Sequence, residues 1–227
     1  KHRKHRTKWD HYFVQWCSHW LPTLQLITKK KPRFSQLPLE ADMIIITPQP
    51  KGLWTSDPIW RYVSPYTVIE FKSIQDPFKT QDFGTLMGYV GLTTRKYRLS
   101  PTTEVAGWLI VPCINQALTE VLTAKHFHLQ TLFTGFHQIH TDLFPFFIVE
   151  YDFLPNEEAF CELKSFMGSG EELLKAMNMA VEKWNDSELY EEYITIISAI
   201  HLKEAEEVTK VKKYEKKNIR KLTETCL

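Results

Sequence analysis

Short apolar runs that alternate with amphipathic segments constrain the fold of this chain more than any other feature. The runs are rich in β-branched and aromatic side chains, which predicts buried strands. They lie at residues 41–47, 66–73, 105–112 and 145–153. Apolar residues at helical spacing predict helices at 83–94 and 115–134 between them. Because alternating strands and helices form a sheet with helices packed on it, we expect an α/β fold with a mixed central sheet flanked by helices.

Both ends of the chain are expected to be helical. Apolar residues from Trp9 to Leu21 recur at helical spacing, and Pro22 ends that helix. A charged linker is expected after it, and a long irregular connection at 48–65. Beyond Pro155 the pattern is helical throughout, with helices predicted at 157–167, 171–184 and 187–215. We therefore expect a core domain at 1–155 and a C-terminal helical extension at 156–227.

The composition is that of an ordinary globular protein. Hydrophobic residues make up 43% of the chain and its formal net charge is +1, so the overall charge directs it neither to nucleic acid nor to membranes. The four cysteines are far apart and form no CxxC pair, which favours free thiols in a reducing compartment. No apolar stretch reaches the ~18 residues of a membrane span, and no signal peptide is recognised. We expect a cytoplasmic protein without a membrane partner.

The run VIEFKS, residues 68–73, places two charges in a predicted strand. Residues two apart in a strand point to the same face, so Glu70 and Lys72 share one face while Ile69 and Phe71 lie on the other. Unpaired charges on a buried strand are costly. The strand therefore either ends in solvent, where the two charges form a solvated pair, or borders a cleft where they take part in chemistry.

The interpretation as a cleft is favoured because Asp42 begins the preceding predicted strand. Neighbouring strands would bring Asp42 beside Glu70, and two carboxylates held together repel each other unless a cation lies between them. Mg²⁺ takes one or two protein carboxylates and keeps its waters for a phosphate substrate. Lys72 would orient or deprotonate the attacking water, or stabilise charge on the phosphate. We therefore expect phosphodiester hydrolysis, with Asp42, Glu70 and Lys72 as catalytic residues and the two carboxylates as metal ligands.

This pattern resembles the PD-(D/E)XK nuclease superfamily. The resemblance rests on Asp42 and on Glu70-Phe71-Lys72, each in an apolar strand, after an amphipathic first helix and before another helix. The stretch EFKSIQDPFKTQDFGTLMGYVGL is similar to uncharacterised bacterial members near the recombination-promoting nuclease and transposase-associated branch. The resemblance covers residues 9–153 and implies a restriction-endonuclease-like core. It also implies a nuclease that acts on DNA with Mg²⁺, for which Mn²⁺ can substitute.

Members of this superfamily carry further residues around the metal site. On the first helix Asp10 is the candidate acid here, with a helix-terminus charge as the alternative. Glu40, just before the strand, is either a secondary ligand or a strand-edge charge. Some members have a glutamine four residues before a tyrosine on the helix after the ExK strand. Tyr89 matches that tyrosine, but Thr85 replaces the glutamine, which favours a packing role for Tyr89.

Three segments of the sequence are rich in lysine and arginine. Each is expected either to contact phosphate or to form a solvated face. They lie at 1–8, 29–33 and 210–221. The first segment precedes the helix expected beside the cleft, so Lys4, Arg6 and Lys8 are the candidate nucleic-acid-binding residues. Trp54 and Trp60 either pack or stack on unpaired bases. The C-terminal helices are a candidate surface for a homodimer or for another partner.

Two alternatives to this hypothesis follow from other residues. The histidines near the middle of the chain form an HxH pair and an HxxH pair, but they lack a nearby cysteine, so ordinary histidines are favoured over a zinc site. They are His126, His128, His137 and His140. The missing glutamine supports a second function, namely a catalytically inactive nuclease-fold module that binds nucleic acid or assembles with a partner.

Overall fold

The structure is a computed structural model that describes residues 9–32, 41–47 and 52–209. These residues form two compact units that meet in the sequence between Pro155 and Asn156. The first unit contains all the strands and the second is helical. The strands are β1 Ile27–Lys30, β2 Met43–Ile46, β3 Tyr66–Phe71, β4 Val105–Val111, β5 Leu129–Phe133, β6 Phe136–Ile139 and β7 Phe146–Glu150.

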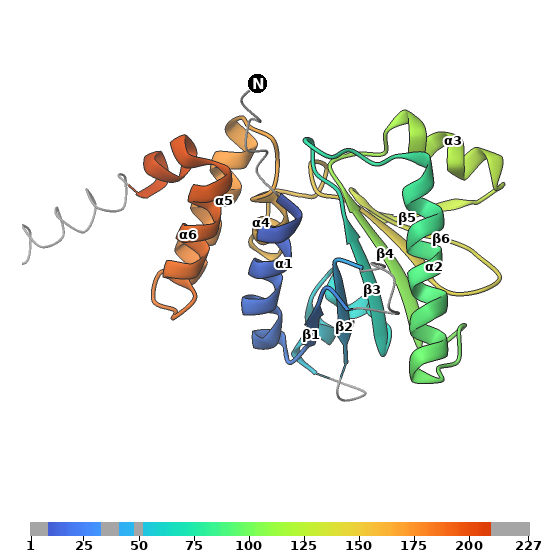
Figure 1. The fold of residues 1–227 in the computed structure, drawn as a ribbon. Helices are drawn as coiled ribbons and strands as arrows, with labels where there is room; N and C mark the ends of the chain where they lie inside the picture. The colour runs from blue at the N-terminus through green and yellow to red at the C-terminus, as the bar shows by residue number, and fades with distance from the viewer. Residues whose placement is uncertain (1–8, 33–40, 48–51, 210–227) are drawn as a thin grey trace, which may run out of the picture. The chain divides into compact units, whose positions relative to one another are not determined.

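The strands build one seven-stranded mixed sheet in the order β1-β2-β3-β4-β7-β6-β5 (Figure 1). The pairs β1–β2 and β2–β3 are antiparallel, β3–β4 and β4–β7 are parallel, and β7–β6 and β6–β5 are antiparallel. The central parallel strands are connected through helices, which is why their runs are apolar on both faces. The prediction of an α/β fold with a mixed sheet flanked by helices is confirmed.

Helices cover both faces of the sheet. Figure 1 shows α1 (Trp9–Trp20) on one side and α2 (Thr80–Tyr97) with α3 (Gln116–Ala124) on the other. The α2 side is a continuous core in which Leu86 of α2 packs with Val68 of β3. On the α1 side, the ring of Phe13 stacks on Phe71 with 4.2 Å between centroids. Alternation along β3 therefore sends Phe71 to α1 and leaves Glu70 on the α2 face.

The predicted helix at 115–134 is wrong in its second half. The α3 helix ends at Ala124, His126 takes a positive φ of 53°, and a hairpin of β5 and β6 follows. Gly135 makes the hairpin turn with φ 77°. A Cβ atom there would lie 2.8 Å from the Leu154 backbone nitrogen, so the turn is also pressed against a neighbouring chain segment. The apolar residues of this segment recur at helical spacing, so the pairing of β5 with β6 and not the local pattern makes it a hairpin.

A strand also lies where a charged linker was expected. The β1 strand consists of the sequence ITKK and its side chains are largely exposed, so the apolar run that marks a buried strand is missing. It pairs antiparallel with β2 and forms one edge of the sheet. Its lysines are typical of an exposed edge, where charge discourages pairing with other chains.

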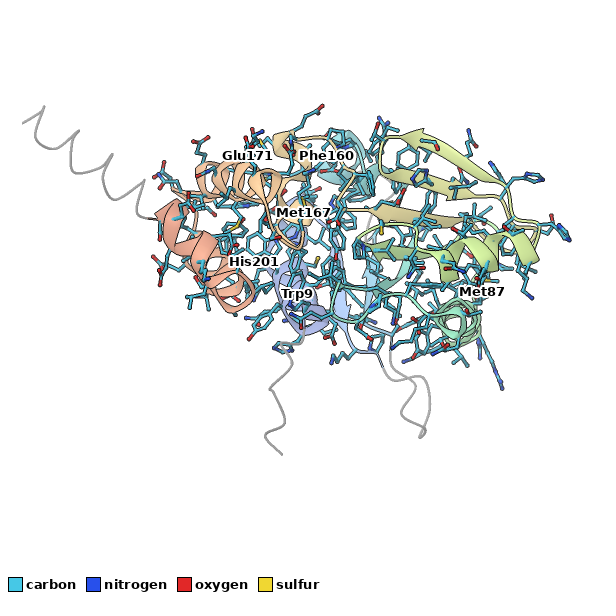
Figure 2. The ribbon with its side chains drawn as sticks, turned by 90° about the horizontal axis from the view of Figure 1, so that it is seen from above. Trp9, Met87, Phe160, Met167, Glu171 and His201 are labelled. Atoms are coloured by element: carbon cyan, nitrogen blue, oxygen red, sulfur yellow. The ribbon has the colours of Figure 1, made fainter. Side chains whose placement is uncertain are left out.

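In the second unit the predicted helix at 171–184 is confirmed, whereas the helices predicted at 157–167 and 187–215 are shorter or interrupted. The helical elements of this unit are the 3₁₀ turn η4 Glu158–Phe160 and the α-helices α4 Cys161–Lys164, α5 Glu171–Trp184 and α6 Tyr190–Ile200, followed by helical residues 202–209. The predicted helix at 187–215 is interrupted because His201 leaves the helical region with φ −132° and ψ 63°. Phe160, Met167 and His201, labelled in Figure 2, are buried.

A buried polar cluster stabilises this helical unit. The Nζ atom of Lys183 lies 2.7 Å from Oε1 of Glu162, whose side chain is 1% exposed. The hydroxyl groups of Ser165 and Tyr193 are 2.7 Å apart and hydrogen-bond to each other. Burial raises the pKa of Glu162, and the Lys183 ammonium opposes that rise. The pair therefore links α4 to α5 in surroundings where neither charge is well hydrated.

Candidate active site

Two carboxylates lie opposite each other where β2 begins and β3 ends. The β2–β3 register pairs Met43 with Ile69, and continuing it by one residue places Asp42 opposite Glu70. The backbone N–H of Phe71 donates to Oδ2 of Asp42 at 2.9 Å, so this carboxylate replaces a carbonyl acceptor at the end of the ladder. That hydrogen bond fixes the Asp42 side chain against the β3 backbone. The expected juxtaposition of Asp42 and Glu70 is therefore present.

Lys72 completes a buried ion pair with Glu70. Its backbone N–H donates to the Ile110 carbonyl at 2.8 Å, which keeps the chain extended beyond β3. Its Nζ atom lies 2.9 Å from Oε1 of Glu70, and the two side chains are only 11% and 12% exposed. The Tyr151 hydroxyl donates to the Lys72 carbonyl at 3.4 Å from the neighbouring segment. The two charges are thus not the solvated pair that a strand end in water would give.

Asp82 is a member of this cluster that the sequence pattern did not single out. Its Oδ2 atom lies 3.4 Å from Nζ of Lys72 and also accepts the Lys79 backbone N–H at 2.8 Å in the first turn of α2. The side chain is 15% exposed. An acidic residue at the start of the helix that follows the ExK strand was the available signal. A turn in which the Ser73 hydroxyl accepts the Asp76 N–H begins the connection that brings Asp82 back to Lys72.

Asp10 adds negative charge to the same place. It lies in the first turn of α1. Its charge raises the pKa of both Asp42 and Glu70, so it is within electrostatic range of both carboxylates. The candidate on the first helix therefore acts electrostatically on both strand carboxylates.

The raised pKa of Asp42 indicates that this negative charge is not balanced. Burial, together with the charges of Glu70 and Asp10, raises the pKa of Asp42 to about 7 against the stabilising Phe71 N–H and the Lys72 ammonium. Burial also raises the pKa of Glu70, while Lys72 opposes the rise. Two adjacent carboxylates thus compete for protons unless a further cation joins them.

Lys72 remains a cation in these surroundings. Burial on its own lowers the pKa of Lys72, but the charges of Glu70, Asp82 and Asp42 raise it above its ordinary value. An ammonium group held by carboxylates donates hydrogen bonds and does not act as a base at neutral pH. Its geometry is therefore suited to binding an anionic oxygen or orienting a water molecule.

The chemistry of the donor set fits a hard divalent cation. Carboxylate oxygens are the ligands that Mg²⁺ selects, and one or two of them suffice when waters and a phosphate complete the octahedron. Among residues 9–32, 41–47 and 52–209, however, the structure shows no group of three or more His, Cys, Asp or Glu side chains that could hold a metal ion. Asp42 and Glu70 therefore provide a two-carboxylate site and not a complete protein cage.

The other predicted site residues have different outcomes. Tyr89 is buried in the core between α2 and the sheet, which agrees with a packing role. Trp54 and Trp60 are also buried, and the Trp60 ring stacks on Trp108 with 5.5 Å between centroids, so they form part of the core and not a surface for bases. The remaining candidates lie outside the described residues. These are Lys4, Arg6, Lys8 and Glu40.

The histidine pairs form structural hydrogen bonds. Nε2 of His137 lies 2.8 Å from Oε1 of Glu150, and Nδ1 lies 3.0 Å from the Thr131 hydroxyl. His140 contacts Oε1 of Gln130 through Nε2 at 2.7 Å. These three contacts connect segments of the β5–β6–β7 region. His137 and His140 therefore hold strands together, as expected for ordinary histidines.

Comparisons with known proteins leave this site without a relative. No protein-family model, no curated protein and no solved structure matches the chain. None of the helices within the described ranges is long and apolar enough to cross a membrane. What the site can do is therefore inferred from its geometry.

Proposed function

We propose that this chain is a metal-dependent nuclease of the PD-(D/E)XK type that hydrolyses phosphodiester bonds, with DNA as the substrate and a restriction-endonuclease-like core. The observation that carries the proposal is the convergence of Asp42, Glu70 and Lys72 at one end of the β2–β3 pair. The arrangement combines two adjacent carboxylates with one buried ammonium group, a set that suits metal-assisted hydrolysis of a phosphodiester.

Each residue has a separate role in this proposal. Asp42 and Glu70 would hold Mg²⁺ or Mn²⁺, which supplies Lewis-acid activation of the phosphate and of a bound water. Lys72 donates hydrogen bonds to the attacking water or to a non-bridging phosphate oxygen, because its carboxylate neighbours keep it protonated. The water oxygen forms the new bond to phosphorus as the bond from phosphorus to the leaving ester oxygen breaks. The attacking water releases one proton to solvent, and the leaving oxygen takes up one proton from solvent.

The test is cleavage of supercoiled plasmid with Mg²⁺ or Mn²⁺. Wild-type protein is compared with Lys72→Ala and with the control Lys79→Ala, which removes an exposed lysine paired with Asp76. Removal of a group that stabilises transition-state charge costs about 10²–10³ in rate, so Lys72→Ala should lose at least ~100-fold. The cleavage rate of Lys79→Ala should stay within about twofold of the wild-type rate, because an exposed ion pair contributes little. Equal cleavage by wild type and Lys72→Ala, or none with either ion, refutes the proposal.

A second function is favoured by one observation. The described residues offer two carboxylates and no three-ligand group, which is compatible with a nuclease-fold module that binds nucleic acid or assembles with a partner without turnover. Such a protein would bind DNA with a steep salt dependence and would not bind Mn²⁺. Calorimetric titration with Mn²⁺ separates the two: saturable binding that Asp42→Asn abolishes supports the nuclease, and no binding supports the inactive module.

A further inference from the structure

Strand β1 carries consecutive lysines along one edge of the sheet. It is the terminal strand of the sheet order, next to β2. Lys29, Lys30 and Lys31 are exposed. Lys29 and Lys30 lie in β1, and Lys31 follows it with a positive φ of 40°. Because side chains alternate along a strand, Lys29 and Lys30 leave opposite faces of this edge.

The end of α2 adds further cations beside this strand. Nζ of Lys29 donates to the Tyr97 hydroxyl at 3.1 Å and lies 5.0 Å from the centre of the Tyr97 ring. Nζ of Lys96 lies 5.7 Å from the same ring centre, and Tyr97 itself stacks on Tyr66 of β3 with 4.7 Å between centroids. Two lysines from distant parts of the chain thus share one aromatic ring. We define the basic edge as Lys29, Lys30, Lys31, Arg95, Lys96 and Arg98, all exposed.

The segments that form the basic edge contain no acidic residues. The sequence has no Asp or Glu between Asp10 and Glu40, and none between Asp82 and Glu104. The carboxylate of Glu104 accepts the Ser100 backbone N–H at 2.6 Å. Positive charge is therefore concentrated here although the chain as a whole has a net charge of +1. A local field of this kind attracts a polyanion even when the overall charge does not.

The basic edge leads directly to the candidate active site. The Lys31 backbone N–H donates to the Asp42 carbonyl at 3.0 Å. In the β1–β2 register Lys29 pairs with Ile44, two residues from Asp42, which corresponds to roughly 7 Å along the strand. A polymer with one phosphate at Asp42 and Glu70 would thus have neighbouring phosphates within reach of the basic edge.

We propose that the basic edge binds the phosphate backbone of a nucleic acid whose strand continues into the candidate active site. The path of the nucleic-acid strand into the candidate active site rests on the proposed function. Binding to the basic edge, however, is measured without cleavage. Lysine and arginine contribute the charge, and Tyr97 holds Lys29 in place. Tyr97 is not proposed to stack on a base, because its ring already stacks on Tyr66.

The test is fluorescence anisotropy with a labelled 30-base-pair duplex, and with a single strand of the same length, in EDTA. Two double variants each remove two charges from the basic edge, Lys29→Gln/Lys30→Gln and Arg95→Gln/Lys96→Gln. The control Arg61→Gln/Lys125→Gln removes two exposed charges from elsewhere in the same unit. Each lost phosphate contact lowers the salt slope by about one, so each edge variant should lower the slope by about two and weaken binding roughly 100-fold near 0.1 M salt.

The outcomes separate this inference from the proposed function. Loss of binding in both edge variants, with the control within about twofold of wild type, supports the inference even if the wild-type protein cleaves nothing. Equal binding by all variants refutes it even if the wild type cleaves DNA. Wild-type binding to phosphatidylserine vesicles but to neither nucleic acid, lost in the edge variants, also refutes it in favour of a membrane surface. Circular dichroism checks that each variant is folded.

Discussion

Lys72 and Glu70 form a buried ion pair at the end of β3, with 2.9 Å between Nζ and Oε1. Both residues leave the same face of one strand, so their contact is encoded locally in the ExK spacing. What is not local is the second carboxylate at the same ammonium group, Asp82, whose Oδ2 atom lies 3.4 Å from Nζ. The ammonium is therefore held from two directions, by the strand and by the helix that follows it.

Asp82→Asn is expected to lower cleavage while preserving the fold. Asparagine keeps an acceptor for the Lys79 N–H, so the helix cap survives and the free energy of unfolding should change by less than ~0.5 kcal/mol. The charge that orients Lys72 is lost, and we expect roughly tenfold slower plasmid cleavage. The control is Asp76→Asn, an exposed acid paired with Lys79. If Asp82→Asn is also slower in a Lys72→Ala background, Asp82 acts independently of Lys72 and this account of it is wrong.

Asp42→Asn is expected to flatten the pH dependence of stability. The pKa of Asp42 is raised from 3.8 to about 7 by burial and by Glu70, so the folded state binds the proton more tightly than the unfolded state. In the wild type, proton binding to Asp42 therefore contributes its full stabilisation below pH 3.8. That stabilisation is lost as the pH rises toward 7. At pH 8 without metal, Asp42→Asn should therefore be more stable than wild type by about 1 kcal/mol or more.

Urea unfolding at a series of pH values measures this effect. The exposed variant Asp76→Asn serves as a control and should follow the wild-type pH profile. Parallel pH profiles for wild type and Asp42→Asn would contradict the assignment of a raised pKa to Asp42.

Lys183→Met is expected to destabilise the helical unit. It removes the ammonium 2.7 Å from the buried Glu162 carboxylate and leaves that carboxylate without its charge partner. Breaking a buried pair in this way costs about 3–5 kcal/mol. Lys175→Met is the matched control, because Lys175 is exposed on the same helix and pairs with Glu171 at 3.1 Å. Its loss should cost under ~1 kcal/mol in the same thermal unfolding experiment. Similar effects for both lysines would show that Glu162 does not depend on Lys183.

Gly135→Ala and Gly88→Ala are expected to change stability in opposite directions. At Gly135 the positive φ of 77° and the Leu154 nitrogen 2.8 Å from the added Cβ both oppose alanine. Gly88 is helical, and an added Cβ meets no atom within 4 Å. Alanine at position 88 should therefore stabilise the protein by ~0.5–1 kcal/mol, and alanine at position 135 should destabilise it by more than ~1 kcal/mol. A Gly135→Ala protein as stable as wild type would refute the described turn.

The strands around the site could be predicted because their signals are local. The apolar runs mark β2 and β3, and the period of two places Glu70 and Lys72 on one face. The position of Asp42 opposite Glu70 depends on strand register, which is a long-range property; the sequence suggested it only through the resemblance and the order of the elements.

Other features could not be read from local patterns. Asp82 reaches Lys72 only because the 72–79 connection folds back, so in sequence it is indistinguishable from any helix-capping acid. The β1 strand is exposed and lysine-rich, and it is a strand only because β2 offers it an edge. The helical spacing of apolar residues continues past Ala124, but His126 and Gly135 adopt positive φ. Tertiary contacts, and not helix propensity, determine these conformations.

The most direct test of the central claim is an anomalous-scattering map from crystals soaked in Mn²⁺. We expect a peak between the carboxylates of Asp42 and Glu70, with Lys72 still within hydrogen-bonding distance of Glu70, and no peak in Asp42→Asn crystals. Wild-type crystals at saturating Mn²⁺ that show no peak at these carboxylates, or a peak that persists in Asp42→Asn, would contradict a metal-dependent active site at this end of β3.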